Sequence, residues 1–117
     1  MTSKIGLYVG SFNPITLGHI DIVRQSLNIF DKVIICVSTN TNKKYEMTPY
    51  IRYDLVKSSI IECFNEELRN RIDIEVCSDL NIVSICKKFN SYNIIRGLRA
   101  SSDYEFEATL NLAYKEM

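Results

Sequence analysis

The chain has 117 residues, of which 46% are apolar and 24% charged, a composition typical of one globular domain and not of a disordered chain. Fourteen basic residues balance fourteen acidic ones, which excludes the overall positive field of a typical nucleic-acid-binding protein but leaves room for a local anion site. The apolar runs are too short to span a membrane, and the N-terminus lacks a signal peptide's apolar core, so we expect a cytoplasmic protein without membrane contact.

Four short apolar runs, rich in β-branched residues, predict β-strands. The runs cover residues 5–9, 32–38, 72–76 and 92–96. Most of them are continuously apolar and do not alternate with polar residues, which is typical of strands that are buried on both faces of a parallel sheet.

The stretches that follow the strands have helical spacing and predict four helices. Thr48 is a candidate N-cap with Pro49 at the first helical position, Asp79 is a candidate cap for the third helix, and a capping box runs from Ser102 to Glu105 in the last. The apolar residues that would face the sheet are Ile20, Val23, Leu27 and Phe30, then Tyr53, Val56, Ile60 and Cys63, then Ile82, Ile85, Cys86 and Phe89, then Phe106, Leu110, Ala113 and Met117.

The element order β-α-β-α-β-α-β-α, without repeats or linkers, predicts a single α/β domain over residues 1–117 with a doubly wound parallel sheet. Ligands of such sheets bind beyond the carboxyl ends of the strands, near the point where the strand order reverses. The residues that follow each strand are therefore the candidates for a functional site.

The first strand is followed by Gly10-Ser11-Phe12-Asn13-Pro14, and a helix then opens at Thr16-Leu17-Gly18-His19. Gly10 and Gly18 allow close backbone approach or unusual dihedral angles, and a helix N-terminus favours a phosphate. His19, the only histidine of the chain, would be directed at that phosphate. The dinucleotide fingerprint GxGxxG and the P-loop pattern are both absent. The alternative is that His19 is simply a polar residue of the first helical turn.

Basic residues follow two further strands. Lys43 and its neighbour Lys44 come after the second strand, and Arg96 and Arg99 come after the fourth. Arginine binds phosphate oxygens through two parallel hydrogen bonds, so these residues and His19 together predict a polyphosphate site. The alternatives are a solvated lysine pair and a surface arginine pair that is bridged to acidic residues of the last helix.

The four cysteines have neither CxxC nor zinc-finger spacing and lie in apolar surroundings. They are Cys36, Cys63, Cys77 and Cys86. We expect buried free thiols, with no disulfide and no metal site in the chain.

Two segments of the sequence, "GSFNPITLGHIDIV" and "IIRGLRASSDYEFE", resemble bacterial phosphopantetheine adenylyltransferase, a family of the HxGH-type nucleotidyltransferases. Thr16 stands at the first histidine position of that signature, as is usual in this branch. The resemblance runs from about residue 4 to 117 and includes "NKK" at 42–44 and "SDL" at 78–80. The TxGH pattern alone would indicate only the superfamily, whereas its combination with RGLR and DYEFE is specific.

The resemblance implies a Rossmann-like nucleotidyltransferase fold and an activity. Members of the family transfer the adenylyl group of ATP to 4′-phosphopantetheine, giving dephospho-coenzyme A and pyrophosphate in coenzyme A synthesis. The resemblance also implies a homo-hexamer and a magnesium ion that is bound through the phosphates of ATP, with no metal ligand from the protein.

The resemblance assigns roles to positions of this chain that match the family's motifs. It implies that phosphopantetheine is bound by Ser11, Lys43, Ile82 and Arg96. It implies that ATP is bound by Ser11, Phe12, His19, Gly97, Leu98, Arg99 and Glu107. Among these residues, His19, Lys43 and Arg99 would be catalytic, as donors to the reacting phosphates.

Two departures from the family pattern leave alternatives open. Asn13 replaces the commoner aspartate, which removes one charge but keeps the local turn bonds. The family also continues past the position of Met117 with a further strand and a Ser/Thr-rich segment, so we expect the domain to be incomplete at its C-terminus. A non-catalytic nucleotide- or phosphopantetheine-binding fragment, and a nucleotidyltransferase with another acceptor such as nicotinamide mononucleotide or phosphocholine, are the competing hypotheses.

Overall fold

The computed structural model describes residues 4–39, 48–77 and 82–96. Within these ranges the four predicted strands and the first three predicted helices are present, within a few residues of their expected bounds. The predicted helix over 102–117 and its capping box, as well as the candidate cap Asp79, lie outside the described residues. The elements are β1 (Ile5–Gly10), α1 (Leu17–Ser26), β2 (Lys32–Ser38), α2 (Pro49–Cys63), α3 (Glu66–Arg69), β3 (Ile72–Cys77), α4 (Ile82–Phe89) and β4 (Asn93–Ile95).

Two helix starts show how local sequence sets these bounds. Thr48 caps α2 as predicted, because its side chain accepts a hydrogen bond from the Ile51 N–H, and Pro49 occupies the first turn, where no N–H is needed. The short helix α3 was not predicted. Its cap is Asn65, whose Oδ1 accepts a hydrogen bond from the Leu68 N–H at 2.9 Å.

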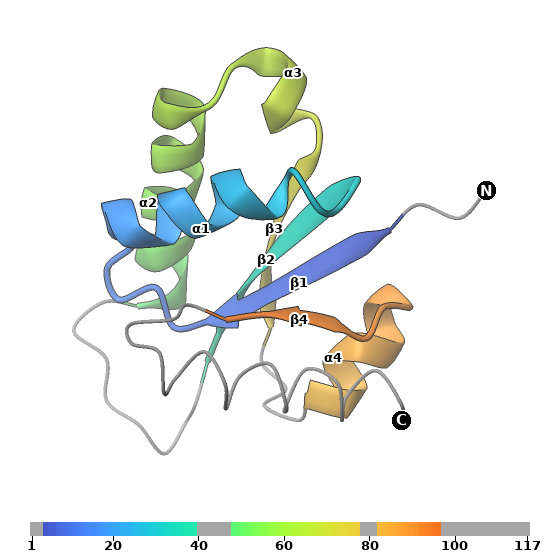
Figure 1. Ribbon diagram of the computed structural model, residues 1–117. Coiled ribbons are helices and arrows are strands. Elements are labelled where there is room, and N and C mark those ends of the chain that lie inside the picture. The colour runs from blue at the N-terminus through green and yellow to red at the C-terminus, as the bar shows by residue number, and fades with distance from the viewer. Residues whose placement is uncertain (1–3, 40–47, 78–81, 97–117) are drawn as a thin grey trace, which may run out of the picture.

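The four strands form one parallel sheet in the order β3-β2-β1-β4, which confirms the predicted doubly wound α/β architecture. The chain builds outwards from β1 through β2 to β3 and then returns to place β4 on the other side of β1. Helices α1 and α2 cover one face of the sheet, and α4 covers the other (Figure 1). The strand order therefore reverses between β1 and β4, and a ligand of this fold is expected at their carboxyl ends.

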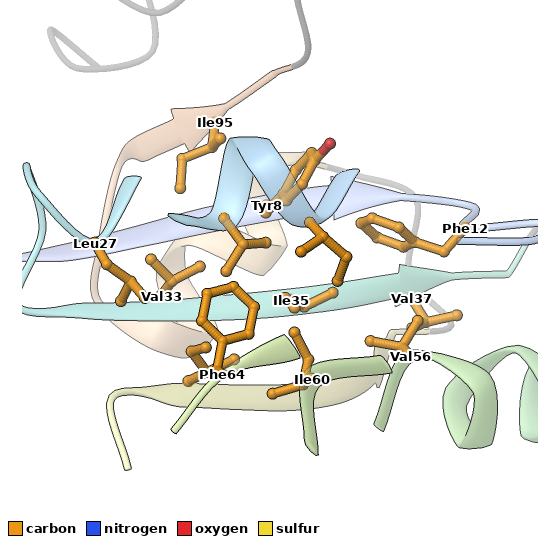
Figure 2. Close-up of a cluster of buried hydrophobic side chains, with 13 residues drawn as sticks. Tyr8, Phe12, Leu27, Val33, Ile35, Val37, Val56, Ile60, Phe64 and Ile95 are labelled. Atoms are coloured by element: carbon orange, nitrogen blue, oxygen red, sulfur yellow. The ribbon is translucent and has the colours of Figure 1, made fainter. Parts of the chain in front are cut away.

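A hydrophobic cluster fills the space between the sheet and helices α1 and α2 (Figure 2). Its centre is β2, whose Val33, Ile35 and Val37 are fully buried and point towards the two helices. A second cluster lies on the opposite face under α4, where Ile85 and Cys86 pack with Leu7, Ile34 and Cys36. Both faces of the central strands are buried, which explains why their sequences are continuously apolar.

All four cysteines are free, as expected. Cys36, Cys77 and Cys86 are buried, whereas Cys63 at the end of α2 is only partly buried. In the part of the chain that the structure describes, no helix is long and apolar enough to cross a membrane.

We expect Ile35→Ala to lower the free energy of unfolding by about 2–5 kcal/mol, because it leaves a cavity at the centre of the larger cluster. Ile29→Ala is the matched control, since Ile29 is 62% exposed, and it is expected to change stability by no more than about 0.5 kcal/mol. Urea denaturation of both variants measures the difference. Equal losses would contradict the placement of Ile35 in the core.

Candidate functional site

The loop that follows β1 lies at the point where the strand order reverses. Phe12 has a φ of 47°, in the left-handed region that non-glycine residues seldom adopt. Of the two properties expected at Gly10 and Gly18, the unusual dihedral angle is absent, since neither has a positive φ. Close approach is present at Gly10, where an added Cβ would lie 3.3 Å from the Phe12 ring. The chain takes its left-handed turn at Phe12 instead, where burial of the aromatic ring, only 2% exposed, offsets the backbone cost.

His19 occupies the third position of α1, and its ring closes the helix N-terminus. The backbone N–H of Thr16 donates a hydrogen bond of 2.9 Å to Nδ1 of His19, and the Thr16 hydroxyl lies 3.1 Å from the same nitrogen. A nitrogen that accepts from an N–H carries no proton, so the ring is the neutral tautomer with its proton on Nε2. The side chain of His19 is therefore set as a hydrogen-bond donor through Nε2.

Two aromatic side chains hold the imidazole from the core side. The Phe12 ring meets the His19 ring edge-on with the centroids 5.0 Å apart, and Tyr8 meets Phe12 in the same way at 5.1 Å. The centroids of Tyr8 and His19 are 6.2 Å apart. These contacts are favourable ring geometries, and they connect the first helical turn to the buried strand β1.

Arg96 reaches the same edge of the sheet from β4. The register pairs Tyr8 of β1 with Ile95 of β4, so that Arg96 leaves the sheet beside the residues that lead into Ser11. Arg96 is exposed and Ser11 is half-buried. The structure thus brings three predicted site residues, Ser11, His19 and Arg96, to the carboxyl ends of β1 and β4.

Of the other predicted site residues, one lies on helix α4 and the rest fall outside the described ranges. Ile82 begins α4, is partly buried and packs against the second hydrophobic cluster. The residues that lie outside the described ranges are Lys43, Gly97, Leu98, Arg99 and Glu107.

Sequence reasoning missed Arg52, the largest fully buried side chain among the described residues. Its Nη1 donates to the carbonyl of Ser11 at 2.6 Å and to the carbonyl of Ser38 at 2.9 Å. Arg52 thereby joins the carboxyl ends of β1 and β2. The one indication in the sequence was the position of Arg52. It lies one turn into the helix that Thr48 caps, directly before Tyr53, the first residue predicted to face the sheet.

Asn13, which stands in place of the commoner aspartate, is half-buried in the same loop. Its Oδ1 is buried and has no hydrogen-bond partner among the described residues. The side chain therefore presents an oxygen acceptor at the end of β1.

A family model described as Cytidylyltransferase-like matches residues 7–116 of the chain. The phosphopantetheine adenylyltransferase of Pelagibacter ubique is 42% identical over 108 residues, which are 92% of this chain and 64% of that protein. The phosphopantetheine adenylyltransferase of Cytophaga hutchinsonii is 38% identical over 113 residues, which are 97% of this chain and 71% of that protein. The chain belongs to the phosphopantetheine adenylyltransferase family.

Solved structures share the fold of this phosphopantetheine adenylyltransferase family member at low identity. The lipopolysaccharide core biosynthesis protein from Thermoplasma volcanium has a TM-score of 0.59 at 15% identity, covering 80% of this chain and 73% of that one. The nicotinic acid mononucleotide adenylyltransferase of Plasmodium falciparum has a TM-score of 0.58 at 18% identity, covering 80% of this chain and 49% of that one. These similarities support the Rossmann-like α/β fold that the sequence predicts.

The buried phenol next to the site gives a pH-dependent prediction. Burial raises the pKa of Tyr8 from its ordinary value near 10 to about 12. The folded state therefore disfavours the phenolate more than the unfolded chain does. The resulting stability is complete below pH 10 and falls as the pH rises towards 12, by an amount on the order of 2–3 kcal/mol.

We expect Tyr8→Phe to remove this loss of stability at alkaline pH. The unfolding free energies of the variant and the unchanged chain, compared from pH 9 to about 12, measure the effect. Tyr50→Phe serves as the control, because Tyr50 is 77% exposed, and should keep the fall. A Tyr8→Phe protein with the same alkaline loss as the unchanged chain would show that another group is responsible.

Proposed function

We propose that this chain transfers the adenylyl group of ATP to 4′-phosphopantetheine, giving dephospho-coenzyme A and pyrophosphate. The proposal rests on the position of Ser11, His19 and Arg96 at the carboxyl ends of β1 and β4, where the strand order reverses, in a chain that belongs to this family. The relatives from Pelagibacter ubique and Cytophaga hutchinsonii bear the name of that reaction.

The chemistry requires positioning more than proton transfer. A phosphate monoester has a second pKa of about 6, so the attacking oxygen of phosphopantetheine is already deprotonated at neutral pH. That oxygen forms a bond to the α-phosphorus of ATP, and the bond from the α-phosphorus to the bridging oxygen of the β-phosphate breaks, which releases pyrophosphate. No general base and no covalent intermediate are needed.

His19 suits this step as a neutral donor. Thr16 N–H occupies Nδ1, so the ring donates through Nε2 and does not take up the proton of a nucleophile. A preorganised donor directed at the oxygens where negative charge develops lowers the barrier without reorganisation. In this proposal Arg96 binds the phosphate of phosphopantetheine, while Ser11 and Phe12 contact the phosphates at the end of β1. Lys43, Arg99 and Glu107 retain the roles that the resemblance implies.

Magnesium belongs to the proposal as an ion held by the phosphates of ATP. Within the described residues, no group of three or more histidine, cysteine, aspartate or glutamate side chains is placed to bind a metal. This does not count against magnesium, which keeps several waters and binds mainly through substrate phosphates. When bound through the phosphates, it would supply positive charge that offsets theirs.

The cytoplasmic location and the homo-hexamer are further parts of the proposal. The location is the expectation from the short apolar runs and the N-terminus, and the homo-hexamer is what the resemblance implies. Multi-angle light scattering of the purified chain measures the oligomeric state.

The proposal predicts dephospho-coenzyme A when the chain is incubated with ATP, magnesium and 4′-phosphopantetheine, as detected by mass spectrometry. Nicotinamide mononucleotide and phosphocholine, offered as acceptors in parallel, should give no adenylylated product. Product from one of these acceptors alone would replace phosphopantetheine as the substrate. Binding of phosphopantetheine without any product would favour the non-catalytic alternative.

We expect His19→Ala to lower turnover by two to three powers of ten, the loss of a transition-state donor contributing about 3–4 kcal/mol, while phosphopantetheine binding stays nearly unchanged. Gln25→Ala is the control on the same helix, since Gln25 is exposed and its side chain donates a hydrogen bond to Asp21 Oδ2 on the helix surface, at 2.8 Å. Calorimetry and steady-state kinetics separate the two effects. Near-full turnover in His19→Ala would remove this residue from the mechanism.

A further inference from the structure

Arg52 is a buried cation that is hydrogen-bonded to backbone carbonyls at the edge of the candidate site. Its side chain is fully buried, and Nη1 donates to the carbonyls of Ser11 and Ser38 at 2.6 and 2.9 Å. The Ser38 hydroxyl donates in turn to the carbonyl of Gly10 at 3.1 Å. Two successive carbonyls at the end of β1 are thus fixed by groups from α2 and β2.

The bond to Ser11 also sets the direction of the next amide. The carbonyl of Ser11 and the N–H of Phe12 belong to one planar trans peptide, so they point in opposite directions. Because the carbonyl of Ser11 points at the buried guanidinium, the N–H of Phe12 points away from it. Backbone N–H groups directed out of a loop beside a helix N-terminus are donors for phosphate.

The same bond is coupled to the histidine through Phe12. Phe12 has a positive φ, a conformation that persists only when its surroundings hold it, and its ring contacts the His19 ring at a centroid distance of 5.0 Å. Loss of the Arg52 bond would free the Ser11–Phe12 peptide to rotate. The aromatic support of His19 would move with it.

The positive charge of Arg52, like its hydrogen bonds, favours phosphate at the ends of β1 and β2. A guanidinium stays protonated in proteins, and a charge that is shielded from water is screened less than one at the surface. A positive charge beneath the ends of β1 and β2 therefore favours an anion above them.

We propose that Arg52 is a positioning residue for the phosphate groups bound at the end of β1, acting through the Ser11 carbonyl and the Phe12 peptide. The inference rests on the proposed function for the identity of the nucleotide. Binding of a simple phosphate compound follows from the role of Arg52 alone and does not depend on the identity of the nucleotide. Arg52 itself does not need to touch the substrate.

The test compares Arg52→Met with Arg71→Met in the full chain. Arg71 is the matched control because it also holds carbonyls, those of Leu27, Phe30 and Asp31, at the opposite, amino-terminal edge of the sheet. Titration calorimetry with magnesium pyrophosphate measures affinity at a temperature well below both unfolding midpoints. Steady-state kinetics measures the KM for ATP separately from kcat.

We expect Arg52→Met to weaken pyrophosphate binding and raise the KM for ATP at least tenfold, whereas Arg71→Met lowers thermal stability and leaves both within twofold. Arg52→Lys should recover part of the affinity, because both bonds leave a single nitrogen that an ammonium can replace in part. Unchanged affinity in Arg52→Met, or an equal loss in Arg71→Met, would overturn the role.

A second comparison covers the case in which Arg52→Met does not fold. Arg52→Lys should then bind pyrophosphate at least threefold more weakly than Arg71→Lys, because the shorter side chain cannot reach both carbonyls equally. Equal affinities of these two lysine variants would overturn the proposal.

If the unchanged chain binds pyrophosphate but forms no dephospho-coenzyme A, the reaction is wrong and the test of Arg52 still holds. If it binds no pyrophosphate, Arg52 has no phosphate site to position.

Discussion

The pairing of β1 on both of its edges is the constraint on which the candidate site depends. Pairing with β2 continues the sheet in one direction, and pairing with β4 continues it in the other. Because the chain leaves β1 towards one side and returns to it from the other, the loops after β1 and β4 diverge around a common edge. Ser11 and His19 come from the first of these loops, and Arg96 comes from the second.

Backbone groups, more than charged side chains, prepare this edge for phosphate. The N–H of Thr16 fixes the tautomer of His19, and the carbonyl of Ser11 accepts from a buried arginine. The first bond is local, between residues 3 apart in the sequence, and the second joins residues 41 apart, so the geometry of the loop depends both on its own sequence and on the fold. A site of this kind holds donors in place before the ligand arrives, which is what charge stabilisation in a transition state requires.

The sequence predicts the strands and their parallel, doubly wound arrangement well for a physical reason. The runs at β1 and β2 are continuously apolar because helices cover both faces, and this pattern is visible without any tertiary information. His19 was also placed correctly in the first helical turn, because the predicted helix opens at the segment Thr16-Leu17-Gly18-His19.

Three features were beyond sequence reasoning. Helix α3 has only four residues, too few to show a period, and only its Asn65 cap indicated it. The positive φ falls on Phe12 and not on Gly10 or Gly18, because burial of the Phe12 ring decides the conformation and not the residue's own preference. Arg52 was overlooked because arginine is rarely fully buried, and its carbonyl partners come together only in the folded chain.

Nitrogen NMR of the imidazole, with and without magnesium pyrophosphate, tests the central claim most directly. The chain has a single histidine, so its two ring nitrogens need no further assignment to a residue. The account predicts an unprotonated Nδ1 and a protonated Nε2 in the free protein, with the Nε2 signal shifting when pyrophosphate binds. A proton on Nδ1, or ring signals that stay unchanged at saturating pyrophosphate, would contradict it.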